Sequence, residues 1–109
     1  MSIPSKVTLF LDNDNYIKIE GLVDGLDPVS YFNGATVTAT LLDSAGLPVT
    51  GVTDLPLTYV PASNGNYIGN VQETFAATAG SYTLVIDADQ GGIIGSWHIA
   101  CKVKVRKNE

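Results

Sequence analysis

The chain has 109 residues, a length that fits one domain, and only 16% of them are charged, against about 25% in a typical soluble protein. The formal net charge is −5: residues 1–101 contain two basic and ten acidic residues, and residues 102–109 contain four basic and one acidic residue. This acidic body argues against nucleic acid binding, and no apolar run approaches the roughly 20 residues of a membrane span.

Strands are expected throughout, because apolar and polar residues alternate with period two and turn residues separate the runs. The clearest run is ATVTATLL, in which every second side chain is apolar and threonines occupy the other positions. Pro56 cannot donate to a strand ladder, so we expect its strand at a sheet edge. DQGGIIG reads as a glycine-rich hairpin region. The expected strands are residues 6–11, 16–23, 35–42, 55–60, 66–72, 81–88 and 96–106.

No helical period of useful length occurs, and seven to eight short strands are typical of a sandwich or barrel. We therefore expect one all-β domain over residues 1–109. Its N-terminal segment, MSIPSKVTLFL, has only a five-residue apolar run, shorter than the roughly 7–15 residues of a secretory signal core. The single cysteine cannot form an internal disulfide. These features predict a protein that is not exported by a signal peptide and stays in the cytoplasm of the producing cell.

The only tryptophan, histidine and cysteine lie within five residues, in the run WHIAC. On a strand, successive side chains point to opposite faces. Trp97 and Cys101 therefore fall in an apolar row with Ile99, and His98 falls in the opposite row beside Lys102. This alternation predicts a buried thiol and a solvated histidine that cannot act together on a metal or a substrate.

Two segments resemble the start of a calcium loop, DADQGG from Asp87 and DNDNY from Asp12. Both lack the closing glutamate that the calcium motif requires, and clustered Asp, Asn and Gly are also common in β-turns. We therefore expect no metal and no cofactor. No nucleophile elbow, phosphate loop or dinucleotide fingerprint occurs either, so the protein is not expected to be an enzyme.

Three aromatic residues, Tyr31, Phe32 and Tyr59, lie in or beside expected loops. They are candidates for a patch that binds a carbohydrate or a protein partner. The alternative is that they pack under a loop, where aromatic side chains commonly contribute to a core.

The central run GATVTATLLDSAGLPVTG, followed by NGNYIGNV and AGSYTLVI, resembles bacterial and phage immunoglobulin-like modules. This resemblance implies an immunoglobulin-like two-sheet β-sandwich with about seven to eight strands. It also gives Tyr82 the position of a tyrosine corner, whose hydroxyl bonds back to the backbone. The antibody cysteine two residues later is replaced by Leu84, and the tryptophan is on the last strand, so the resemblance is to the broad fold.

Short modules of this kind resemble small structural proteins of tailed phages and prophages, which implies a virion component of the head or tail. The function expected on this basis is non-enzymatic and structural; the alternative is an immunoglobulin-like module that binds a carbohydrate or a cell surface. Apolar residues also occur in the rows expected to face solvent, which predicts a homo-oligomer or docking on a larger protein assembly. These candidate interface residues are Phe10, Leu42, Ile68 and Val85.

Overall fold

The computed structural model describes residues 6–23 and 30–105, and its regular structure is entirely β, which confirms the all-β prediction. Every predicted strand is present, with ends shifted by up to a few residues. No helix in the described ranges could cross a bilayer. The strands are β1 (Lys6–Leu11), β2 (Asn15–Ile19), β3 (Thr36–Leu42), β4 (Leu55–Tyr59), β5 (Tyr67–Val71), β6 (Gly80–Gln90) and β7 (Ile93–Val105).

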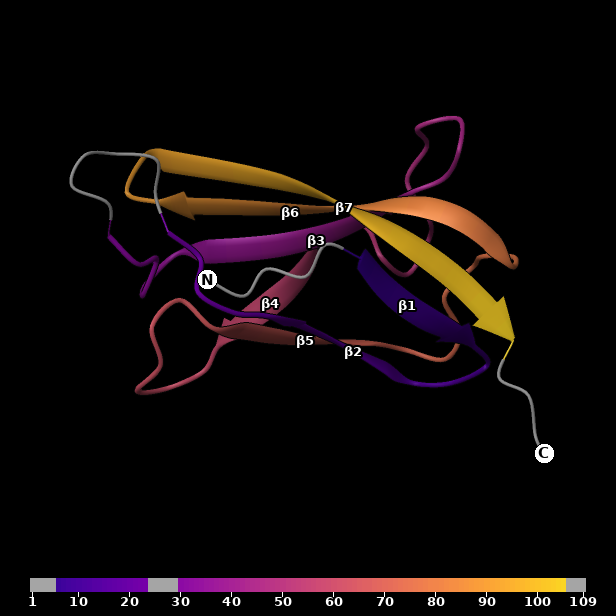
Figure 1. The fold of residues 1–109 in the computed structure, drawn as a ribbon, viewed down its shortest axis with the longest axis horizontal. Coiled ribbons are helices and arrows are strands. Elements are labelled where there is room, and N and C mark those ends of the chain that lie inside the picture. Colours follow the sequence, from indigo (N-terminus) through magenta and orange to yellow (C-terminus); the bar gives the residue numbers. More distant parts are fainter. Residues whose placement is uncertain (1–5, 24–29, 106–109) are drawn as a thin grey trace.

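The seven strands form one continuous mixed sheet in the order β1-β7-β6-β3-β4-β5-β2. Only the β1–β7 pairing is parallel among the described strands; the other neighbours run antiparallel. The sheet curves around its core, so that β3, β6 and β7 lie on one side and β2 and β5 on the other (Figure 1). The expected pair of separate sheets is therefore replaced by a single, nearly barrel-like sheet.

β4 makes the sheet continuous because it changes partner along its length. Its first part pairs with β3, from Leu55 to Leu57, and its last two residues, Thr58 and Tyr59, pair with β5. The prediction that this strand lies at an edge is wrong. Pro56 is tolerated inside the sheet because it precedes the two residues that pair with β5, so its missing N–H removes no bond from that ladder.

The core is formed by the inward rows of the strands and by side chains from the loops that close the ends. The alternation read from the sequence holds on β3, where every second residue is buried. On β7 it holds for Ile99, Cys101 and Val103, whereas Trp97 is half-buried and Val105, expected in the same buried row, is 64% exposed at the end of the strand. Loop residues Leu22, Phe32, Val52 and Phe75 also enter the core. The largest fully buried side chain is Tyr67, whose hydroxyl donates to the Phe32 carbonyl and accepts from the Ala35 amide at 3.2 Å.

β6 and β7 form a long hairpin that turns within the predicted glycine-rich region. The turn residues Gly91 and Gly92 have φ of 60° and 92°, as a two-residue type I′ turn requires. The side chain of Asp89 accepts from the Gly92 amide at 3.0 Å. Both strands continue up to this turn, so they are longer than the alternation alone indicated.

The two edge strands, β1 and β2, approach each other and are joined by the side chain of Asn15. Its amide oxygen accepts from the Phe10 N–H at 2.9 Å, and its amide nitrogen donates to the Phe10 carbonyl at 3.0 Å and the Asn13 carbonyl at 2.9 Å. Asn15 is 8% exposed. The side chain of Asn15 thus links the two edge strands, β1 and β2, by hydrogen bonds.

Candidate functional site

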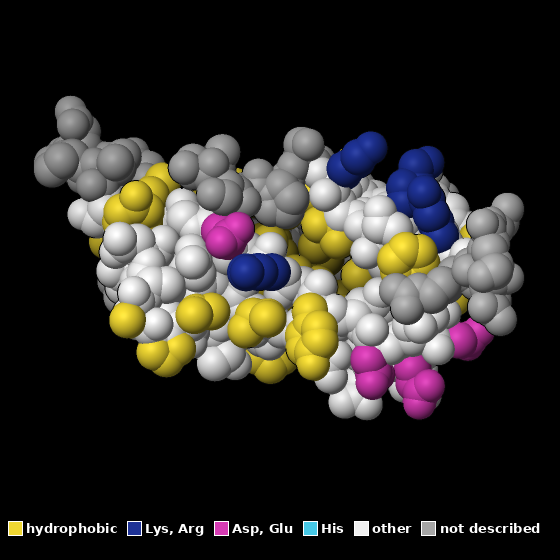
Figure 2. All heavy atoms as spheres, turned by 60° about the horizontal axis from the view of Figure 1, so that its bottom comes forward, with side chains coloured by type: hydrophobic (Ala, Val, Ile, Leu, Met, Phe, Trp, Pro, Cys, Tyr) yellow, Lys and Arg dark blue, Asp and Glu magenta, His cyan; other side chains and the backbone are white. Residues whose placement is uncertain are grey.

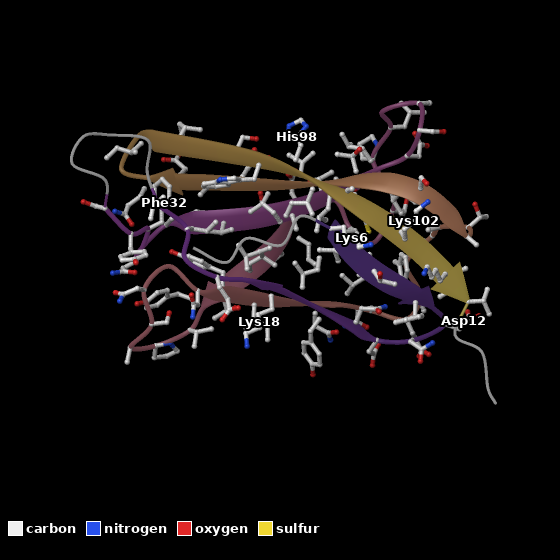
Figure 3. All side chains as sticks on the ribbon, in the orientation of Figure 1. Lys6, Asp12, Lys18, Phe32, His98 and Lys102 are labelled. Carbon is white, nitrogen blue, oxygen red and sulfur yellow. The ribbon has the colours of Figure 1, made fainter. Side chains whose placement is uncertain are left out.

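The cluster of rare residues on β7 is an ordinary strand segment, as predicted. His98 is exposed and points away from the core (Figure 3), whereas Cys101 is buried and only 2% exposed. Burial raises the pKa of the Cys101 thiol from 9.0 to about 11, so the thiolate is scarce at neutral pH. The two side chains therefore cannot form a nucleophile–base pair.

The aromatic residues proposed as a ligand patch do not form one surface. Phe32 is 1% exposed and packs edge-on against Trp97, with ring centroids 6.2 Å apart. The Phe32 amide donates to the Leu22 carbonyl at 2.9 Å, in a loop whose side chains enter the core. Tyr59 is half-buried and its hydroxyl donates to the Ser63 carbonyl, which leaves Tyr31, at 46%, as the exposed member. Packing under loops accounts for Phe32 and Tyr59.

One aspartate in each of the two calcium-like segments accepts a hydrogen bond from a backbone amide. Asp89 caps the glycine turn, and Asp14 accepts from the Glu73 amide at 2.9 Å. Asp87 is exposed on β6. Across residues 6–23 and 30–105, no three His, Cys, Asp or Glu side chains gather closely enough to hold a metal ion.

Tyr82 makes the bond expected of a tyrosine corner: its hydroxyl donates to the Thr78 carbonyl at 2.9 Å and accepts from the Thr78 amide at 3.1 Å. Tyr82 also lines an open hollow of about 460 Å³, whose other titratable side chain is Asp43. Asp43 accepts from the Ala45 and Leu47 amides at 2.9 and 3.0 Å. The polar groups of this hollow thus hold the loops beside it.

The four candidate interface residues are all half-buried, but they divide between two surfaces. Ile68 lies on what we call the β5 face, formed by the outward side chains of β2, β5 and the end of β4. The other three lie on what we call the β6 face. The β6 face comprises Lys6, Thr8, Phe10, Thr36, Thr38, Thr40, Leu42, Ser81, Thr83, Val85, Asp87, Asp89, Ile94, Ser96, His98, Ala100, Lys102 and Lys104.

On β3, β6 and β7 the middle of the β6 face has no Asp, Glu, Lys or Arg, and apart from His98 its side chains are threonine, alanine, valine and leucine. Val85 lies between Thr40 on β3 and His98 on β7, and the next outward residue of β6, Thr83, lies between Leu42 and Ala100. Leu42 and Val85 are thus diagonal neighbours across two strands, a spacing at which larger side chains still touch. Phe10 is farther away, opposite Lys104 at the β1 edge.

The β5 face carries the most exposed large apolar side chain in the described ranges, Tyr16, at 71%. Tyr16 pairs with Asn70, and its neighbour on the same face, Lys18, pairs with Ile68. Figure 2 shows hydrophobic side chains spread in a row over this side of the molecule with few charges between them. Lys18 and His98 point in opposite directions (Figure 3), so the two faces lie on opposite sides of the protein.

Comparison with protein-family models and with curated protein sequences gives no match for this chain. The surfaces of the chain are therefore the features that bear on its function. Sequence reasoning identified which residues point outward but missed that they separate into two faces, since that depends on how the sheet curves. It also missed Asn15, whose only signal was its place in the polar run DNDN.

Proposed function

We propose that this protein is a non-enzymatic, immunoglobulin-like interaction module that self-associates or docks on a larger assembly. The pairing pattern supports the fold part of the proposal. The first strand is parallel to the last, and the pairs β2–β5 and β3–β6 join strands distant in sequence. The change of partner within β4 marks where a two-sheet sandwich would divide.

The main support for self-association is the middle of the β6 face, which has no Asp, Glu, Lys or Arg on β3, β6 and β7. Threonine, alanine, valine and leucine side chains meet there in register over three strands, β3, β6 and β7. A surface of such side chains can meet a second copy of itself without burying an acidic side chain, a lysine or an arginine. Leu42 and Val85, which are half-buried in the isolated chain, would supply its apolar contacts.

The β5 face supports the second half of the proposal. Tyr16 is the type of side chain that anchors protein interfaces, because it combines a large apolar ring with a hydroxyl. A module with adhesive surfaces on opposite sides can join neighbours on both, as in a virion. The resemblance to phage modules makes a head or tail component the kind of assembly that we propose.

Light scattering on the purified protein over a series of concentrations tests this function. We expect the mass to rise above that of one chain, and Val85→Lys to reduce this rise because it places a charge in the uncharged middle. Ser44→Lys, an exposed change in the loop after β3 and outside both faces, serves as the matched control and should have a smaller effect. Two results together would contradict the proposal. The mass would stay that of a monomer, and the wild-type protein would capture from phage or cell extracts no partner whose binding is lost in the Tyr16→Ala variant.

A further inference from the structure

The charged residues of the β6 face are sorted by sign along the strands. Asp87 and Asp89 lie near the β6–β7 turn, and Lys102 and Lys104 lie toward the other end of β7. All four are exposed. None forms an ion pair within residues 6–23 and 30–105: Asp89 bonds to the Gly92 amide, and Lys102 bonds to the Ser81 hydroxyl. One end of this face is therefore acidic and the other basic.

The positions of these charges share a common centre. Asp87 pairs with Ser96, three residues before Ile99, and Lys102 lies three residues after Ile99. The next acid and the next base are spaced in the same way. Asp89 pairs with Ile94, five residues before Ile99, and Lys104 lies five residues after it. Both acid–base separations are thus centred on the pair Leu84–Ile99.

The two aspartates lie on β6 and the two lysines on the neighbouring strand β7. A hydrogen bond of Lys102 nevertheless places its ammonium group over β6. Its ammonium lies 2.7 Å from the Ser81 hydroxyl, which is on β6, the strand that carries the acids. The positive charge therefore lies over the same strand as Asp87, about 20 Å along it at the usual rise of a strand.

We infer that the β6 face binds the β6 face of a second copy of this chain, about a two-fold axis that passes over Leu84–Ile99 at right angles to the strands. This inference rests on the proposed function and names its partner. The rotation places Asp87 of each copy opposite Ser81 of the other, over which the Lys102 ammonium lies. It brings Asp89 level with Lys104, which stands on the neighbouring strand. Such a contact is isologous, so one self-complementary surface forms every bond twice.

Most of the remaining residues of the face fit this arrangement. The axis passes through the middle of the face, so His98 meets Ala100 of the second copy and the Val85 side chains lie close to the contact centre. Lys6 on β1 pairs with Ala100, one residue from the axis, so the rotation also brings it near Lys6 of the second copy at the sheet edge. This is the one approach of like charges among these positions, and it lies at the exposed rim of the contact.

The size of the face predicts a weak dimer. From Ile94 to Lys104 the face is about 33 Å long. It is about 14 Å or three strands wide, because β3 flanks the acidic half of the β6–β7 hairpin and β1 flanks the basic half, so each copy covers at most about 460 Å². The total of about 900 Å² is below the roughly 1,200–2,000 Å² of stable protein interfaces. We therefore expect a reversible, concentration-dependent dimer that weakens as salt screens its charge pairs.

Charge reversal tests the register of the contact. The variant D87K/D89K has lysine at both ends of the face, and the variant K102E/K104E has acids at both ends. Each alone opposes like charges, and its dimer dissociation constant should rise at least about tenfold. Mixed in equal amounts, the two variants regain all four opposite-charge pairs, so they should form a heterodimer about as tight as the wild-type dimer. Sedimentation velocity measures each mixture.

A control variant distinguishes pairing at these particular positions from a general attraction between a variant made more positive and a variant made more negative. E20K/E73K changes the net charge as much as D87K/D89K does but lies after β2 and β5, away from the β6 face. Mixed with K102E/K104E, it should not form the tight heterodimer. If wild-type and both face variants associate equally, the inference is overturned and the proposed self-association stands through another surface. If the wild-type chain is monomeric at every concentration, self-association itself is refuted, and only docking on another assembly is left.

Discussion

Replacing Asn15 with alanine tests whether its side chain joins the two ends of the sheet. The substitution removes three hydrogen bonds of 2.9–3.0 Å from a side chain that is 8% exposed. A hydrogen bond of this kind contributes about 1 kcal/mol net, so we expect Asn15→Ala to lower the free energy of unfolding by about 3 kcal/mol. That is a large share of the roughly 5–15 kcal/mol of a small domain.

Urea unfolding followed by the fluorescence of Trp97 measures this loss. The matched control is Asn13→Ala, in the same turn, whose side chain donates one bond, to the Leu11 carbonyl at 2.8 Å. The control should lose about 1 kcal/mol or less. If Asn15→Ala is no more destabilising than Asn13→Ala, the side chain of Asn15 does not hold β1 against β2, and the reasoning is refuted.

Two further substitutions and one pH series follow from the packing. Gly65→Ala should lower the free energy of unfolding by several kcal/mol, because φ is +72° and a Cβ would lie 2.5 Å from the Leu22 carbonyl oxygen. Gly46→Ala is the control: its φ is +80° but its Cβ would lie in open space, so it should lower the free energy of unfolding by only about 1 kcal/mol. Thermal or urea unfolding measures both. The raised pKa of Cys101 predicts that stability is retained below pH 9 and falls by about 2–3 kcal/mol as pH rises to 11, since unfolding then releases the thiol proton. Cys101→Ala should remove this part of the alkaline loss, and an unchanged slope would contradict the burial of the thiol.

The strands and most of the core rows could be predicted because their signal is local. A strand alternates its side chains with period two, so the rows of β3 and β7 are visible in the sequence itself. The separation of His98 from Cys101 follows from the same rule. The bond of Tyr82 to Thr78 is also local, spanning four residues.

The order of the strands could not be read in this way, because it depends on pairings between distant segments. Pro56 suggested an edge, but β4 lies between β3 and β5 and accommodates the proline where no β5 partner is required. Phe32 looked available in its loop, yet the Leu22 carbonyl fixes its backbone and its ring meets Trp97. Asn15 reaches Phe10 across the short turn between β1 and β2, but its burial depends on β1 and β2 approaching each other as the sheet curves.

The arrangement of the candidate interface residues also depends on contacts between distant segments, which the sequence does not show. Phe10, Leu42, Ile68 and Val85 were predicted as outward residues, and each is half-buried. Their division between the β6 face and the β5 face required the curvature of the sheet. The common centre of the charges on the β6 face required the register of β6 with β7, which places Leu84 opposite Ile99.

A dilution series followed by amide NMR shifts tests whether this protein associates with itself through the β6 face. We expect the amides of Thr83, Val85, His98, Ala100 and Lys102 to shift as the concentration rises, and those of Tyr16, Lys18 and Ile68 on the β5 face to stay fixed. Shifts confined to the β5 face, or spectra that do not depend on concentration, would show that the β6 face does not bind a second copy.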